Sequence, residues 1–360
     1  MFQASSHRKK NPLSRRGVIG AAGAVAAAAA VTPAVFAATE SGTSTTDAGP
    51  GTTPKAFPAT RTAAAEGTDS LPFAASYVAV RWTGAQDGAA IRFGDGSWEP
   101  VTGGCATVED GGTALVPAGA ATAYEVQAPA GARRLRSLAI DPTDGPERTF
   151  LVPSEPTRMR GVRYVSRPAW GADESKRFKD GVVISPEQYY PLQTITVHHT
   201  ATPNDDPAPA ATVRTIYDFH AITNDWGDIG YHFLVDEEGV VYEGRYSGGD
   251  GIPALDPDGN LVTAFHTAGF NSGNLGIALL GTLTDQGPTP AARNSLTRLV
   301  KVIARLKGLD PRARTTFVNP VNGVTKDVPV LSGHRDWLQT DCPGQVMYDL
   351  LAEIRAAAAR

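Results

Sequence analysis

The residues best suited to chemistry lie near the C-terminus, in the motifs Gly333-His334-Arg335-Asp336 and Asp341-Cys342-Pro343-Gly344. They place an imidazole and a thiol eight residues apart. Far upstream, the motif Val197-His198-His199-Thr200 supplies a second imidazole. Two nitrogen donors and one sulfur donor suit a tetrahedral zinc site with one open position, because structural zinc sites usually have four protein ligands and catalytic sites have three and a water. The pattern therefore indicates a hydrolase.

The residues alone leave open whether His198 or His199 binds the metal. Neighbours on a strand point to opposite faces, so only one of the two should reach it. Pro343 at the first position of the last helix would make Cys342 the helix N-cap, where unpaired backbone N–H groups and the helix dipole favour a thiolate. Two neutral imidazoles and one thiolate would leave zinc with a net charge of about +1, which acidifies a bound water.

Strand and helix patterns alternate in the C-terminal part of the chain. Thr289-Pro290 reads as a helix cap, an apolar stripe follows, and Gly308 ends the helix. Strands are expected at 194–199, 231–235, 240–244 and 274–280, and helices around 213–220, 290–307 and 343–354. Residues 164–360 are therefore predicted to form an α/β domain, with a mixed central sheet flanked by helices.

The preceding part of the chain has the pattern of an all-β domain. Short strand patterns separated by Gly-, Asp- and Pro-bearing turns occur at 77–82, 89–93, 114–116, 124–127 and 135–140. They predict a small β-sandwich over 71–147, with an accessory role. Residues 38–70 are mostly Thr, Ser, Gly, Ala and Pro and are expected to form a disordered linker. Residues 148–163 are a second expected linker.

The N-terminus has the pattern of an export signal. Ser14-Arg15-Arg16-Gly17-Val18-Ile19 resembles a twin-arginine signal, and an Ala/Gly/Val-rich stretch runs to a predicted cleavage site after Ala37. A retained membrane anchor is the alternative, which the low apolarity of the stretch disfavours. Removing residues 1–37 would remove five basic residues and no acidic one, so the formal net charge would change from −4 to −9. Such a chain is a poor candidate for binding nucleic acid or anionic membranes.

The chain has two cysteines, Cys105 and Cys342. In an exported protein they could form a disulfide. Because Cys342 has the more specific context, we expect it to be a metal-bound thiolate and Cys105 to be a small buried apolar side chain.

Five motifs resemble those of the type 2 N-acetylmuramoyl-L-alanine amidases, a family that includes the peptidoglycan recognition proteins. They are V-H-H-T, G-D-I-G-Y-H-F, E-G-R, F-N-S-G-N-L-G-I-A and G-H-R-D with D-C-P-G, in family order between about 166 and 354. The resemblance implies that His198, His334 and Cys342 hold zinc and that the phenol of Tyr231 lies near the attacking water. Some phage members have a lysine where this sequence has Thr340, so Thr340 is expected to make a weaker polar contact.

The resemblance also implies a groove for the glycan and peptide of peptidoglycan, with His266 and Asn271 among its lining residues. Two features depart from the family pattern. The segment 246–264 is longer than usual, and Ala264-Phe265 stands where a Gly-Ala pair is common. These departures affect the rim of the expected groove.

The implied reaction is hydrolysis of the amide between the lactyl group of N-acetylmuramic acid and the stem L-alanine. The alternative is a module that recognises peptidoglycan without cutting it; the presence of Cys342 and Tyr231 favours catalysis. A general zinc peptidase is disfavoured because the chain has no His-Glu-x-x-His motif. The expected protein is a secreted or cell-wall monomer whose partner is peptidoglycan, with no nucleic-acid partner and no stable membrane insertion after signal cleavage.

The remaining polar candidates are interpreted as structural. His220 lies on the apolar face of a helix, and His199 and His232 point away from the expected site by strand alternation. Trp170 is expected in the core. Asp336 would either orient an imidazole or stabilise its loop with Arg335.

Overall fold

The structure is a computed structural model that describes residues 51–65, 70–84, 89–101, 111–249 and 252–360. They belong to one compact unit, Ala48–Arg360. The expected signal, part of the first linker and Cys105 lie outside the described residues, so the interpretations made for them stay predictions. Within the described part of the chain, no helix has both the length and the apolar character needed to cross a membrane.

The C-terminal part is built on a five-stranded mixed sheet, as predicted. Its strand order is β17-β16-β19-β15-β22. The four strands from β16 to β22 pair in parallel, and β17 pairs antiparallel to β16, with which it forms a hairpin. The bounds are Thr194–His199 (β15), Phe233–Val235 (β16), Val241–Glu243 (β17), Asn274–Leu279 (β19) and Leu331–Gly333 (β22).

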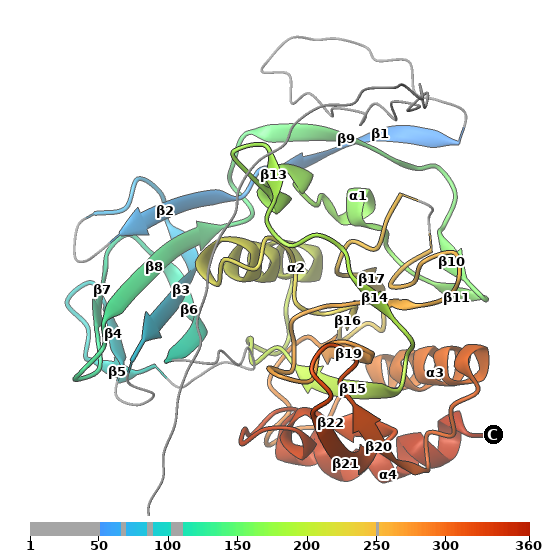
Figure 1. The fold of residues 1–360 in the computed structure, drawn as a ribbon. Coiled ribbons are helices and arrows are strands. Elements are labelled where there is room, and N and C mark those ends of the chain that lie inside the picture. Colours follow the sequence, from blue (N-terminus) through green and yellow to red (C-terminus); the bar gives the residue numbers. More distant parts are fainter. Residues whose placement is uncertain (1–50, 66–69, 85–88, 102–110, 250–251) are drawn as a thin grey trace, which may run out of the picture. The chain divides into compact units, whose positions relative to one another are not determined.

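Helices cover both faces of this sheet (Figure 1). Helix α2 (Pro209–Asp218) packs on one face, and α3 (Pro290–Lys307) and α4 (Gln345–Ala358) pack on the other. Strand alternation explains the division. Phe233 and Val235 of β16 join the core beneath α3 and α4, whereas Leu234 joins the core beneath α2.

Shorter elements connect these parts. They are β10 (Arg158–Met159), β11 (Val162–Arg163), α1 (Arg167–Trp170), η1 (Glu174–Arg177), β12 (Phe178–Lys179), β13 (Val182–Val183), β14 (Tyr189–Tyr190), η2 (Phe219–Thr223), β18 (Leu261–Val262), β20 (Arg314–Val318), β21 (Thr325–Pro329) and η3 (His334–Asp336).

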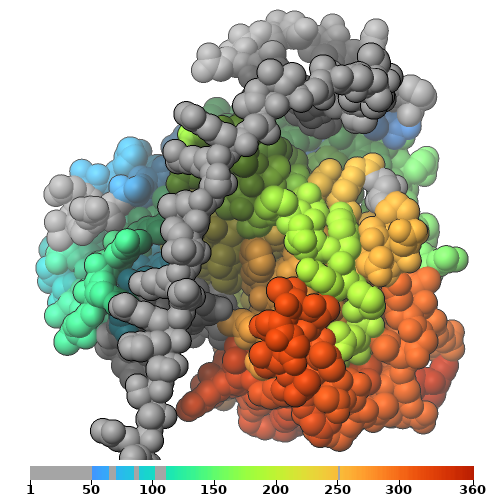
Figure 2. Space-filling model, in the orientation of Figure 1, coloured from blue at the N-terminus to red at the C-terminus, as the bar shows by residue number. Residues whose placement is uncertain are grey.

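Strands β20 and β21 form an antiparallel hairpin beside the central sheet. Phe317 and Val328 of the hairpin form a small core with Trp337, which follows η3. Gln193, just before β15, exchanges two hydrogen bonds with the backbone of Val318, at 2.9 and 3.0 Å. In Figure 2 the orange-to-red surface of the C-terminal part accordingly adjoins the yellow-green surface of the segment that leads into β15.

All five predicted strands of the N-terminal part are present. One sheet has the order β2-β8-β3-β6 and the other β5-β4-β7. A shared core between them includes Val80, Trp82, Ile91 and Tyr124. The bounds are Arg61–Ala65 (β2), Ala75–Thr83 (β3), Ala90–Phe93 (β4), Glu99–Pro100 (β5), Gly112–Ala121 (β6), Tyr124–Gln127 (β7) and Arg134–Asp141 (β8). That these strands form an accessory domain of their own stays a prediction.

The predicted disorder of 52–65 is wrong. Strand β1 (Thr52–Pro58) pairs with β9 (Glu147–Pro153), and β2 is an edge strand of the first sheet. The second expected linker is also partly a strand, because it contains most of β9. Phe57 shows the physical reason: its ring packs on Phe150, with the ring centroids 5.7 Å apart, and is buried against Gly171. Partner strands distant in sequence supply the burial that the local composition lacks.

The start of helix α3 provides a test of the local sequence reasoning. The hydroxyl of Thr289, its N-cap, accepts a hydrogen bond from the backbone N–H of Ala292 at 3.1 Å. Substituting Thr289→Ala should lower the free energy of unfolding by about 1 kcal/mol, because this donor loses its partner. Thr297→Ala, within the same helix, should instead raise the free energy of unfolding by about 0.5 kcal/mol, because alanine has the higher helix propensity. Urea unfolding measures both, and equal effects would contradict the cap.

Candidate metal centre

The register of the central sheet brings the two predicted imidazoles together. Val197 of β15 is paired with Gly333, the last residue of β22. The residue after each member of this pair is a histidine: His198 follows Val197 in β15, and His334 follows Gly333 and begins η3. Both side chains are fully buried, and their ring centroids lie 4.5 Å apart. Two parallel strands thus place side by side two histidines that are far apart in the sequence.

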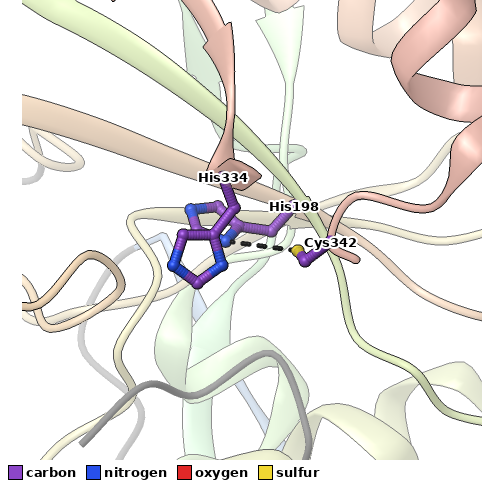
Figure 3. A group of neighbouring side chains, drawn as sticks. All are labelled: His198, His334 and Cys342. Carbon is purple, nitrogen blue, oxygen red and sulfur yellow. Dashed lines mark hydrogen bonds between the residues drawn. The ribbon is translucent and has the colours of Figure 1, made fainter. Parts of the chain in front are cut away.

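Cys342 returns to the same point by a short loop after η3. The backbone N–H of Arg335 donates to the carbonyl of Cys342 at 3.0 Å, which closes the loop. The sulfur of Cys342 then lies 3.7 Å from Nδ1 of His198 (Figure 3). The three expected ligands therefore come from three separate elements and meet at one buried place.

The prediction that Cys342 caps the last helix is wrong. Helix α4 begins at Gln345, with Gly344 as its N-cap. A turn separates the two, in which the N–H of Gly344 donates to the carbonyl of Asp341 at 2.8 Å. Gly344 has φ 89°, and a Cβ there would lie 2.2 Å from the backbone oxygen of Leu283. Cys342 thus belongs to the turn before the helix, and the first N–H groups of the helix do not explain a thiolate.

The donor set fits a zinc ion. One ligand atom from each of His198, His334 and Cys342 lies within 4.8 Å of the other two. In an ideal tetrahedron with usual zinc bond lengths, a nitrogen and a sulfur ligand are about 3.6 Å apart, close to the separation of Cys342 and His198. No fourth His, Cys, Asp or Glu among the described residues joins this group. Three ligands leave one position open, which is typical of catalytic zinc.

The buried nitrogens of His334 support the same conclusion. Within the described residues, neither of its ring nitrogens has a hydrogen-bond partner. Burying polar atoms without partners is costly, and a bound metal removes that cost. Burial, together with the nearby His334, lowers the pKa of His198 to about 4. His198 is therefore neutral near pH 7, which is the form that binds metals.

Tyr231 lies against the predicted ligand His198. Its side chain is 3% exposed, and its ring centroid is 5.3 Å from that of His198 and 5.3 Å from that of His220. Asp228 holds the turn before it, because its carboxylate accepts from the N–H of Ile229 at 2.7 Å and from buried Arg167 at 2.9 Å. The structure thus brings Tyr231 to the site by an ion pair and by ring packing.

Thr340, Asn271 and His266 occupy different places around the site. The hydroxyl of Thr340 accepts from the N–H of Cys342 at 3.3 Å, so it lies within the ligand loop. Asn271 accepts from the backbone N–H groups of His266 and Thr267 at 2.9 and 2.7 Å. His266 is only 1% exposed, and its Nδ1 is 3.0 Å from Nε2 of His198. The expectation of a substrate contact did not anticipate this direct contact with a ligand histidine.

The other histidines have hydrogen-bond partners in the backbone, which agrees with the structural interpretation. Nδ1 of His199 accepts from the N–H of Leu283, and Nδ1 of His220 accepts from the N–H of Gly230, both at 3.0 Å. His232 bonds the carbonyl of Val262 at 2.7 Å and the N–H of Gly276 at 2.9 Å. His199 is thus not part of the candidate metal centre, in agreement with strand alternation.

Trp170 and Asp336 both have structural roles. Trp170 is fully buried, as predicted, and its Nε1 donates to the carbonyl of Glu243 at 2.8 Å. Among the described residues, no hydrogen bond or ion pair joins the carboxylate of Asp336 to an imidazole or to the guanidinium of Arg335. It accepts from the N–H of Gly333 at 2.8 Å and from the hydroxyl of Tyr348 at 2.6 Å. Its role is therefore to hold the loop, through partners that spacing did not indicate.

Comparison with known proteins shows what the part of the chain around the candidate metal centre resembles. Residues 188–345 match the family model described as N-acetylmuramoyl-L-alanine amidase. The human N-acetylmuramoyl-L-alanine amidase is 35% identical over 165 residues, which cover 45% of this chain and 24% of that protein. Human peptidoglycan recognition protein 3 is 29% identical over 210 residues, covering 57% of this chain and 51% of that protein. The part of the chain that carries the candidate metal centre is therefore similar to N-acetylmuramoyl-L-alanine amidases and peptidoglycan recognition proteins.

The chain spans about half or less of the length of these curated relatives. Among solved structures, Drosophila PGRP-LB is 23% identical, with coverage of 53% of this chain and 92% of that chain. Its TM-score is 0.39, which carries no argument about the fold.

The buried His220 gives a prediction for pH dependence. Burial lowers its pKa to about 3, although Asp228 opposes the shift. In the unfolded chain its pKa is about 6.5, so its contribution to stability is complete above that pH and is lost as the pH falls towards 3. His220→Asn keeps an acceptor for Gly230 and removes the titration. We compare the slope of the free energy of unfolding against pH for the two metal-free proteins. At pH 5 this slope should be smaller in the variant than in the parent, by about 1.4 kcal/mol per pH unit.

Urea unfolding between pH 4.5 and 7.5 measures this difference. The other buried histidines contribute equally to both proteins and cancel. Identical slopes for the two proteins would show that His220 is protonated in the folded state.

Proposed function

We propose that this protein is an exported, zinc-dependent N-acetylmuramoyl-L-alanine amidase. Its substrate would be peptidoglycan, and the bond cleaved would be the amide between the lactyl group and the stem L-alanine. The observation that carries the proposal is the buried, three-ligand donor set of His198, His334 and Cys342. Membership of the amidase family supports the reaction class.

His198, His334 and Cys342 would hold the zinc, with two neutral imidazoles and one thiolate as ligands. When bound, zinc acidifies a water and polarises a carbonyl oxygen, which are the two requirements of amide hydrolysis at neutral pH. Burial of all three ligands excludes bulk water from their side of the site and strengthens electrostatic interactions there.

Tyr231 would act on the reacting atoms through its phenol. A phenol can donate a hydrogen bond to a developing oxyanion or orient the attacking water. Packing between His198 and His220 leaves its ring little freedom, so the hydroxyl would be positioned before the substrate arrives. Thr340, in the ligand loop, would add a weaker polar contact, and Asn271 would shape the groove by holding the loop at 266–267.

A second candidate is a module that recognises peptidoglycan without cutting it. Relatives named peptidoglycan recognition proteins favour it, at 27–29% identity. The two candidate functions make different demands on the metal-binding residues. Recognition needs no open metal position, whereas catalysis requires both the thiolate of Cys342 and the phenol of Tyr231. The presence of both residues beside the two histidines supports catalysis.

Release of stem peptides from purified cell wall tests the proposal. The zinc-loaded protein should release peptides with a free N-terminal L-alanine, and a chelator should abolish release. Tyr231→Phe should lower kcat by about 10²–10³-fold while zinc content stays at one per chain. Cys342→Ala should lose both zinc and activity, because one ligand is removed.

Tyr217→Phe is the matched control. Tyr217 is a buried tyrosine of the same core, and its hydroxyl donates to the carbonyl of Asp173 at 3.0 Å. Its loss should change stability and leave kcat within about twofold, as for residues outside a site. Cell-wall binding without release, the same with zinc and with chelator, would instead favour the recognition module.

A further inference from the structure

We infer that His266 is a positioning residue: it fixes the tautomer and the ring orientation of His198, so that His198 presents Nδ1 to the metal. The inference rests on the zinc site proposed above and adds a role that the three ligands alone do not specify. It also replaces the expectation that His266 contacts the substrate directly.

The direction of the hydrogen bonds follows from a single backbone carbonyl. Nε2 of His266 lies 2.9 Å from the carbonyl oxygen of Asn274, the first residue of β19. A carbonyl oxygen only accepts, so Nε2 of His266 must carry the proton. In a neutral imidazole the other nitrogen then has a free lone pair. Nδ1 of His266 is therefore an acceptor.

This acceptor faces the ligand histidine. Nδ1 of His266 is 3.0 Å from Nε2 of His198, and two unprotonated nitrogens at that distance would repel each other. Nε2 of His198 must therefore carry a proton and donate it. The remaining nitrogen, Nδ1 of His198, is then unprotonated, and it is the nitrogen that lies 3.7 Å from the sulfur of Cys342. The chain from Asn274 through His266 to His198 thus selects the nitrogen that faces the metal centre.

Packing holds His266 in this orientation. Gly276 of β19 lies directly beneath its ring, where a Cβ would come within 2.6–2.8 Å of the ring atoms. Asn271 fixes the backbone by accepting from the N–H groups of His266 and Thr267. The hydroxyl of Thr267 lies 2.8 Å from the same Nδ1 and would share its single lone pair with the N–H of His198. These contacts therefore hold the ring where Nε2 faces the carbonyl of Asn274 and Nδ1 faces His198.

Zinc affinity tests the inference without reference to catalysis. In competition with a chromogenic chelator, His266→Leu should bind zinc about 10–100-fold more weakly than the parent, the usual effect of losing a partner that orients a metal-bound histidine. His266→Asn places an acceptor near the position of Nδ1 and should recover most of that affinity. A substrate contact would instead raise KM and leave zinc affinity unchanged.

His232→Leu is the matched control, because the equally buried ring of His232 packs on that of His266, with centroids 5.6 Å apart, while its nitrogens bond backbone groups. Its zinc affinity should equal that of the parent. If His266→Leu also equals the parent, the inference fails and the zinc site stands. If the parent itself binds no zinc, the proposed function fails.

A measurement on the unaltered chain covers the case in which His266→Leu does not fold. Long-range ¹H–¹⁵N correlation spectra of histidine-labelled, zinc-loaded protein report which ring nitrogen carries the proton. Both His266 and His198 should be protonated at Nε2. A proton on Nδ1 of His266 would overturn the inference.

Discussion

The contact between His198 and its three neighbours is the constraint on which the site depends. Its ring lies against His334, Tyr231 and His266, and its Nδ1 faces the sulfur of Cys342. Gathering polar groups out of water is unfavourable unless each finds a partner, and both nitrogens of His334 find none among the described residues. A metal ion would supply the missing partner. We therefore propose that both the stability and the chemistry of the buried cluster depend on a bound cation.

The central sheet meets this constraint through register. Parallel pairing of β15 with β22 sets His334 beside His198, and pairing with β19 sets Gly276 and the carbonyl of Asn274 where His266 can rest. The N-terminal strands reach the same region, because Phe219 of η2 packs with Ala79, Leu138 and Ile140. Asn224, which follows η2, accepts from the hydroxyl of Thr113 at 2.7 Å. The segment that leads to Tyr231 is thus held by the N-terminal strands as well as by the central sheet.

Local patterns predicted the parts of the fold that depend on neighbours in sequence. Alternation separated His198 from His199, and Thr289 marked the start of α3. The choice of His198 as ligand came from the family resemblance and agrees with the donor cluster. Features that depend on distant partners were missed. Cys342 lies in a turn before Gly344 and not at the start of the helix. The low-complexity segment that forms β1 pairs with the distant strand β9. The contact between His266 and His198 cannot be read from their spacing in the sequence.

X-ray absorption spectroscopy of the zinc-loaded protein tests the central claim most directly, because it reports the atoms bound to the metal independently of any activity. The account predicts one sulfur at about 2.3 Å and about three nitrogen or oxygen atoms at 2.0–2.1 Å. The sulfur should disappear from the spectrum of Cys342→Ala. A zinc spectrum with no sulfur neighbour, or one unchanged by that substitution, would contradict the account.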